Sequence, residues 1–164
     1  MTISNSLEYS RLLEFLNWYK NHHEELYMPN IEKHIRSDTS YYAYVDSIAA
    51  QKLLKKYRDS GFFSDRKLQK DSMYVKEATE AYIERNLEVY DYFDHDFILL
   101  TQEVNETLNA ISDTYILSEQ CNLTLGQIAV SIDNYVNLRY TMIKENGLIK
   151  IDQIENLGII EKSP

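Results

Sequence analysis

Hydrophobic and polar residues alternate along the last part of the chain, and this alternation predicts an antiparallel sheet. Residues 135–154 hold two alternating runs that meet at Asn146-Gly147, a dipeptide favoured in type I′ hairpin turns because both positions need positive φ. One face collects Val136, Leu138, Tyr140, Met142, Ile149 and Ile151. The other face carries Asn137, Arg139, Thr141, Lys150 and Asp152. We therefore expect a half-buried sheet whose apolar face is covered by helices.

The first half of the chain has the apolar spacing of three and four residues that is typical of amphipathic helices. A first helix is predicted over 6–26, and Met28-Pro29 stops it because the residue before proline avoids the α region. A second helix starts at Asp46-Ser47 as N-cap and ends at Gly61. A third is predicted over 64–86, with Ser64 as its cap.

The segments between these helices give weaker patterns. Residues 31–35 fit a helical turn and residues 41–45 favour extended backbone, so we expect an ordered connection there. Residues 89–103 pack aromatic and acidic residues closely, which predicts an irregular loop that leads into the core. A short helix is expected over 104–111.

Strands follow the helices, with turns expected near Gly126 and at Asp133-Asn134. The order of helices in 6–111 and a β-meander in 113–157 predicts an α+β fold. In such a fold the N-terminal helices pack on one face of a curved C-terminal antiparallel sheet. At 164 residues, we expect 1–164 to form a single domain.

Composition limits the classes of partner. The formal charge of −9 repels a phosphate backbone, so we do not expect nucleic acid as a partner. The apolar runs are far shorter than the ~20 residues of a membrane-spanning helix, so we expect no transmembrane segment. Cys121 is the only cysteine, which excludes an intramolecular disulfide and a thiolate zinc cluster.

Two acidic residues are the candidates for chemistry. Asp94 and Asp96 lie two residues apart, so in extended backbone both carboxylates could meet one cation or one proton, with Gln102 or Glu103 as a further oxygen ligand. The alternative is that they are solvated in a loop and bond to nearby backbone. Tyr140 joins them as a candidate because a buried hydroxyl needs a partner.

Aromatic residues of the first helix are the candidates for ligand binding. Trp18 and Tyr19 could form an aromatic wall for a ligand, although residues at helical spacing more often pack in the core. His22-His23 diverge by about 100° on a helix, so they do not suit one metal ion together with His34. We predict no metal site and no cofactor, since no phosphate-binding loop or nucleophile elbow is present.

Four segments of the chain are similar to segments of known proteins: FLNWY (15–19), KLLKKYRDSGFFS (52–64), FDHDFILLTQE (93–103) and MIKENGLIKIDQI (142–154). In this order they resemble uncharacterised bacterial proteins of the nuclear transport factor 2-like, or cystatin-like, superfamily. The resemblance implies a curved sheet wrapped by helices around a cone-shaped pocket. It also implies export, to the periplasm or as a lipid-anchored protein whose leader is removed, with a cytoplasmic location as the alternative. Many relatives have Trp two residues after the hairpin glycine, where this chain has Ile149.

Three functions remain open on the sequence. The favoured one is non-catalytic binding of a small ligand or a partner protein through the cone pocket or the sheet face, by way of Trp18, Tyr19, Tyr140 and Gln102. The second is a pocket enzyme that uses Asp94 or Asp96 as general base while Tyr140 polarises a carbonyl. The third is an acidic inhibitor or immunity-type protein that meets a basic partner. Pairing of the sheets would also allow a homodimer.

Overall fold

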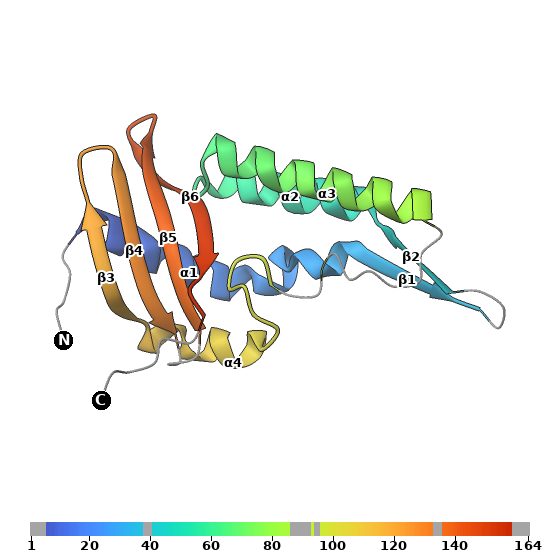
Figure 1. Ribbon diagram of the computed structural model, residues 1–164, viewed down its shortest axis with the longest axis horizontal. Coiled ribbons are helices and arrows are strands. Elements are labelled where there is room, and N and C mark those ends of the chain that lie inside the picture. The colour runs from blue at the N-terminus through green and yellow to red at the C-terminus, as the bar shows by residue number, and fades with distance from the viewer. Residues whose placement is uncertain (1–5, 38–40, 86–92, 94–95, 133–135, 159–164) are drawn as a thin grey trace.

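The computed structural model describes residues 6–37, 41–85, 93, 96–132 and 136–158. Helices form the N-terminal part, and a four-stranded antiparallel sheet in the order β3-β4-β5-β6 follows them. This arrangement confirms the predicted α+β class and the order of its layers. Figure 1 shows the four-stranded sheet at one end of the long axis and a separate two-stranded hairpin at the other end.

Three long helices form where the sequence predicted them, and local capping explains their ends. They are α1 (Leu7–Leu26), α2 (Ser47–Ser60) and α3 (Asp65–Arg85). Ser6 Oγ accepts the N–H of the third residue after it, and Asp46 caps α2 in the same way through Oδ1. Gly61 ends α2 with a φ of +70°, a backbone conformation that favours glycine. Ser64 Oγ caps α3 by accepting the N–H of Lys67 over 3.0 Å.

The segment after α1 differs from the prediction. A 3₁₀ helix η1 (Met28–Ile31) leads into strand β1 (Glu32–Arg36), which pairs antiparallel with β2 (Tyr41–Val45). The helical turn expected over 31–35 is therefore wrong. The extended conformation expected for 41–45 is confirmed, and it supplies the reason: β2 gives β1 the hydrogen-bonding partner that a local pattern does not show.

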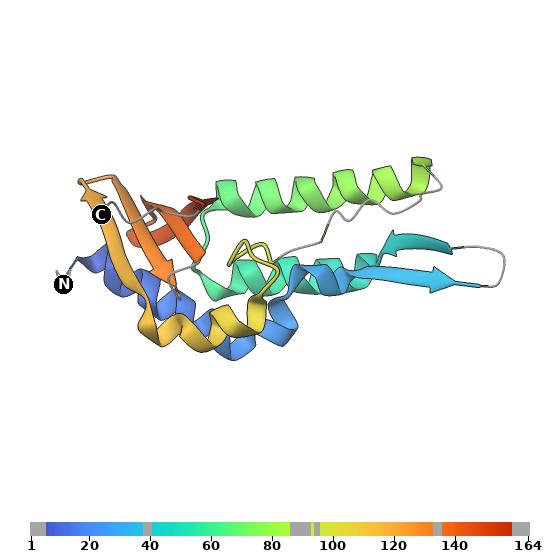
Figure 2. The same ribbon diagram turned by 60° about the horizontal axis from the view of Figure 1, so that its bottom comes forward.

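The hairpin formed by β1 and β2, here called the arm, uses its two faces differently. Ala43 and Val45 are buried, and β2 lies against α3. Ile35, Tyr42 and Tyr44 lie on the exposed side, each about 40% accessible to solvent (40%, 43% and 41%). Figure 2 shows that the arm projects beyond the ends of the helices.

The meander comprises β3 (Tyr115–Cys121), β4 (Leu125–Ile132), β5 (Val136–Glu145) and β6 (Leu148–Asn156). The predicted turn at Asn146-Gly147 is confirmed, with φ of 53° and 79°. The turn expected near Gly126 lies a few residues earlier, between the end of β3 and the start of β4, and Gly126 itself pairs with Met142 inside β4. The chain reverses at Asn122, whose Oδ1 accepts the N–H groups of Thr124 and Leu125. The turn expected at Asp133-Asn134 lies outside the described residues.

Helix α1 covers the apolar face of the sheet (Figures 1 and 2). Its buried residues are Leu12, Phe15, Leu16, Tyr19 and Leu26. The ring of Phe15 contacts that of Tyr140, which lies on the predicted apolar face of β5 with 0% exposure. Gly126 lets the helix approach closely, because a Cβ at this position would lie 2.9 Å from Glu8 Cγ.

The edge of the sheet at β6 is paired with the segment between α2 and α3. The N–H of Ile151 donates to Phe62 O, and the N–H of Ser64 donates to Ile151 O. A β-bulge lies beside this point in the β5–β6 ladder, so the predicted alternation does not continue through Asp152. Asp152 is buried, where its carboxylate accepts the Ser64 hydroxyl and pairs with Arg66.

The described part of the loop predicted over 89–103 is irregular and runs inward, since Phe93, Asp96, Ile98 and Leu99 are buried. It leads to α4 (Val104–Asn109) and the 3₁₀ helix η2 (Ala110–Asp113), close to the predicted helix over 104–111. Among the described residues, no helix has both the length and the apolar character that are needed to cross a membrane.

Candidate functional site

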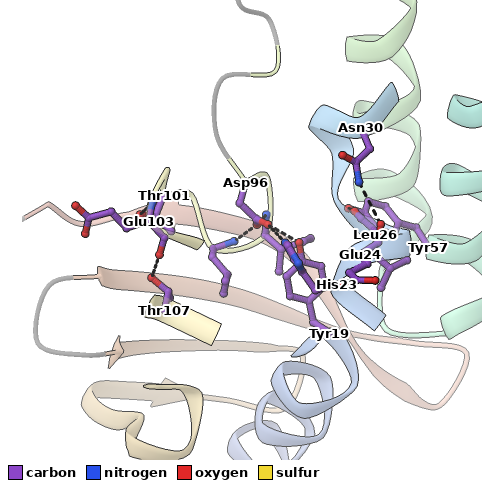
Figure 3. A network of polar contacts seen from close by, with 12 residues as sticks. Tyr19, His23, Glu24, Leu26, Asn30, Tyr57, Asp96, Thr101, Glu103 and Thr107 are labelled. Carbon is purple, nitrogen blue, oxygen red and sulfur yellow. Dashed lines mark hydrogen bonds and ion pairs between the residues drawn. The ribbon is translucent and has the colours of Figure 1, made fainter. Parts of the chain in front are cut away.

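The carboxylate of Asp96 is fully buried between α1 and the loop that carries it (Figure 3). Its Oδ2 accepts the hydroxyl of Tyr19 over 2.5 Å and lies 3.4 Å from His23 Nε2. Its Oδ1 accepts the N–H groups of Ile98 and Leu99 over 2.7 and 2.6 Å. Both oxygens are therefore occupied by protein groups, as expected for a buried carboxylate that orders a loop.

Phenol groups surround this carboxylate and stay protonated at neutral pH. Burial raises the pKa of Tyr19 well above its usual value, and the negative charge of Asp96 adds to the shift. The same two causes, burial first, raise the pKa values of Tyr57 and Tyr140. The Tyr57 hydroxyl donates to Leu26 O over 2.8 Å, whereas that of Tyr140 has no hydrogen-bond partner among the described residues. Tyr140 therefore does not hydrogen-bond to Asp96.

The remaining predicted site residues lie apart from one another. Asp94 falls outside the described residues, and Gln102 is exposed on the loop before α4. Trp18 is half-buried on α1, where its ring stacks on His22 at 5.4 Å between centroids. Tyr19, one residue later, points to Asp96 instead. The structure thus brings Tyr19 and Asp96 together, and it places Trp18 in a different environment.

A groove of about 560 Å³ lies between the end of α1 and the side of α2. Its apolar lining comes from Tyr27 and Ile31 on one side and from Ala49 and Leu53 of α2 on the other. Polar and charged residues complete the lining: Glu25, Asn30, Lys52, Lys55, Lys56 and Asp59. We call this the α1–α2 groove. Its volume and its combination of an apolar surface with polar and charged groups fit the general character of small-molecule sites.

A second, smaller groove of about 290 Å³ adjoins the first along the same two helices. Trp18 and His22 line it, and we call it the Trp18 groove. The two grooves share Glu25, Lys56 and Asp59. Glu25 and Lys56 form an ion pair that joins α1 to α2, and this hydrogen bond lowers the pKa of Glu25. The ion pair therefore stands at the boundary between the two grooves.

Three lysines of α2 face the α1–α2 groove, and sequence reasoning did not single them out. Lys55 pairs with Asp59 and Lys56 with Glu25, whereas Lys52 makes no ion pair with the described residues. Their positions, together with Ala49 and Leu53, follow helical spacing, so a stripe of lysines beside apolar residues was readable in the sequence. The sequence did not show that this stripe lines a groove, because the opposite wall is formed by Tyr27 and Ile31, which lie far from α2 in the sequence.

Within the described residues, no group of three or more His, Cys, Asp or Glu side chains is placed to hold a metal ion. Cys121 is exposed on β3, and partial desolvation of its thiol, followed by the charges of Glu8 and Glu119, raises its pKa to about 11. At neutral pH the thiol is therefore protonated and a weak nucleophile.

Comparisons with protein-family models, with curated proteins and with solved structures found no match to this chain.

Proposed function

We propose that this protein is a non-catalytic binding protein that holds a small, mostly apolar ligand in the α1–α2 groove. The observation that carries the proposal is the concave surface formed by Tyr27, Ile31, Ala49 and Leu53, with charged groups at its edge. Ligand sites combine a volume of about 300–1,000 Å³ with such a lining. The proposal keeps the binding role expected from the sequence and places it between α1 and α2 instead of in a cone under the sheet.

The surroundings of Asp96 favour binding over general-base catalysis. A general base must reach the proton of a substrate, but the carboxylate of Asp96 has 0% exposure and accepts bonds from Tyr19, Ile98 and Leu99. Neither Asp96 nor Tyr140 lines the α1–α2 groove or the Trp18 groove. These contacts support a structural role for the carboxylate.

A neutral fluorescent probe, N-phenyl-1-naphthylamine, tests the proposal. We expect saturable binding with quenching of Trp18, the only tryptophan of the chain, which lines the adjoining groove. Ala49→Trp fills the α1–α2 groove and should weaken binding by about tenfold or more, since the loss of a bound ring costs well over 1.4 kcal/mol. Ile48→Trp is the matched control, because Ile48 is 65% exposed on the same helix and does not line the groove.

Two results would contradict the proposal. One is the absence of saturable probe binding to the wild-type chain. The other is equal affinity in Ala49→Trp and Ile48→Trp, with both variants shown to be folded by circular dichroism. If Ala49→Trp does not fold, the wild-type chain still gives a test. The efficiency of energy transfer from Trp18 to the bound probe then decides whether the probe lies beside this groove.

A second candidate function, binding of a partner protein, is favoured by the arm. Its exposed side presents Ile35, Tyr42 and Tyr44, and the rings of the two tyrosines lie 6.4 Å apart. Tyrosine is enriched at protein interfaces, and a two-stranded hairpin leaves strand edges that can pair with another chain. With a second copy as the first partner to test, Tyr42→Ser/Tyr44→Ser should lower the dimer fraction in sedimentation velocity. A monomeric wild-type chain at high concentration would remove the second copy as the partner.

A further inference from the structure

The charge in the α1–α2 groove is opposite to that of the chain. Three lysines and two carboxylates line the groove, which gives +1, whereas the whole chain carries −9. In an acidic protein, a local positive site beside an apolar surface concentrates anions that have an apolar body. We infer that the ligand is an amphipathic anion, namely a single-chain carboxylate that is free in solution. This inference rests on the proposed function.

Lys52 is the residue that would hold the anionic head. It lines the groove from α2, one turn after Ala49, and it makes no ion pair with the described residues. Lys55 and Lys56 are each already paired with a carboxylate. A lysine ammonium is a compact charge on a flexible stem, so it can follow a head group at the groove edge while its methylenes cover the apolar part of the ligand.

The apolar chain of the ligand would lie on Tyr27, Ile31, Ala49 and Leu53. Each methylene that leaves water in this groove should tighten binding about fourfold. The Glu25–Lys56 ion pair stands between this groove and the Trp18 groove, so the gain should stop when the chain reaches that pair. The pair therefore sets the chain length that the groove accepts.

The same ion pair also tunes the affinity for anions. Glu25 neutralises Lys56 at the boundary of the groove. Glu25→Gln removes a negative charge from the lining and frees the ammonium of Lys56, which gives a second cation for the carboxylate. Lys52→Gln acts in the opposite direction. The two substitutions should therefore move the affinity for a carboxylate in opposite directions. The ratio of the carboxylate affinity to that of a neutral chain of the same length separates this charge effect from any change in apolar contact.

Displacement of N-phenyl-1-naphthylamine by decanoate and by decanol, its neutral counterpart, tests this inference on the full chain. In the wild type, decanoate should bind roughly threefold to tenfold more tightly than decanol, because a partly exposed charge pair adds a modest free energy. Lys52→Gln should remove that difference, and Glu25→Gln should enlarge it. Lys76→Gln is the control: it changes the net charge equally on α3, where Lys76 is 75% exposed and away from both grooves. Added salt should shrink the difference.

The outcomes separate the two proposals. The inferred anionic ligand is overturned if decanol binds as tightly as decanoate. It is also overturned if Lys52→Gln leaves the affinity difference between decanoate and decanol unchanged. In both cases the proposed small-ligand site stands. A Lys76→Gln effect as large as that of Lys52→Gln also overturns the anionic ligand, since the charge of the whole chain would then be responsible. Absence of probe binding to the wild-type chain overturns the proposed function itself.

Discussion

The hydroxyl of Tyr19 donates to Oδ2 of Asp96 over 2.5 Å, and this bond joins residues that are 77 positions apart in the chain. Tyr19 is buried on α1 and points to Asp96, which lies in the loop before α4 (Figure 3). The contact therefore ties the first helix to the loop that precedes the meander. Because both groups are fully buried, water cannot replace either partner when one is removed.

Removing either partner should destabilise the fold. Tyr19→Phe leaves Asp96 without its hydroxyl donor and should cost about 1–3 kcal/mol. Asp96→Ala should cost about 3 kcal/mol or more, because the Tyr19 hydroxyl and the N–H groups of Ile98 and Leu99 then all lose an acceptor. Urea unfolding measures the loss in the free energy of unfolding for both variants, with Tyr42→Phe on the exposed arm as control. Midpoints within error of the wild type would contradict the role given to Asp96.

Alkaline titration tests the environment of the buried tyrosines. Tyr19, Tyr57 and Tyr140 have pKa values raised above 10.0 in the folded chain, chiefly by burial. The unfolded chain loses these protons near 10.0 and the folded chain does not, so stability should fall as pH rises above about 10. Below that pH both states keep the protons, and these groups add no pH dependence.

Ultraviolet absorbance of the phenolates measures this effect directly. In the folded chain, Tyr140→Phe should leave the titration step near pH 10 unchanged, since Tyr140 does not ionise there. A smaller step in Tyr140→Phe would show that its hydroxyl is accessible, contrary to its 0% exposure.

The close approach of α1 to β4 predicts the behaviour of Gly126. A Cβ there would lie 2.9 Å from Glu8 Cγ and 3.2 Å from Cys121 Sγ, so Gly126→Ala should cost about 1–3 kcal/mol by overpacking. Glu8→Ala should restore part of this loss in the double variant, since the nearest atom belongs to that side chain. Thermal unfolding of the single and double variants gives the free energy of interaction between positions 8 and 126. Full additivity of the two substitutions would contradict the contact.

Cys121 should react slowly with thiol reagents despite its exposure. Its pKa is raised to about 11 by partial desolvation of the thiol and by the charges of Glu8 and Glu119, so only a small fraction is thiolate at neutral pH. Glu8→Gln should lower the pKa and raise the rate of alkylation, whereas Glu24→Gln, which is exposed elsewhere on α1, should not. A rate equal to that of an unhindered model thiol would contradict the raised pKa.

Local signals in the sequence predicted the helices and the last hairpin well. Ser6, Asp46 and Gly61 mark helix ends through bonds and backbone angles that involve only near neighbours. Asn146-Gly147 fixes its turn in the same way. The helical turn predicted over 31–35 is wrong because the extended form of this segment depends on pairing with β2. The turn predicted near Gly126 lies a few residues earlier, at Asn122, because Gly126 serves close packing of α1 on the sheet and not the reversal.

The candidate sites depended even more on distant contacts. Asp96 was singled out as acidic, but its burial against Tyr19 follows from tertiary packing. The lysines of α2 form a readable stripe, yet the groove exists only because Tyr27 and Ile31 lie against that helix. The resemblance to nuclear transport factor 2-like proteins implies a pocket beneath the sheet, and in that space the rings of Phe15 and Tyr140 contact each other.

Nuclear magnetic resonance titration of the isotope-labelled chain with decanoate tests the central claim most directly, because it locates binding residue by residue. Our account predicts saturable shifts of the amide signals that centre on Tyr27, Ile31, Ala49, Lys52 and Leu53, with little change on the arm or on the far side of the sheet. Shifts that centre on the arm, or a spectrum that decanoate leaves unchanged, would contradict the claim that the α1–α2 groove binds an amphipathic anion.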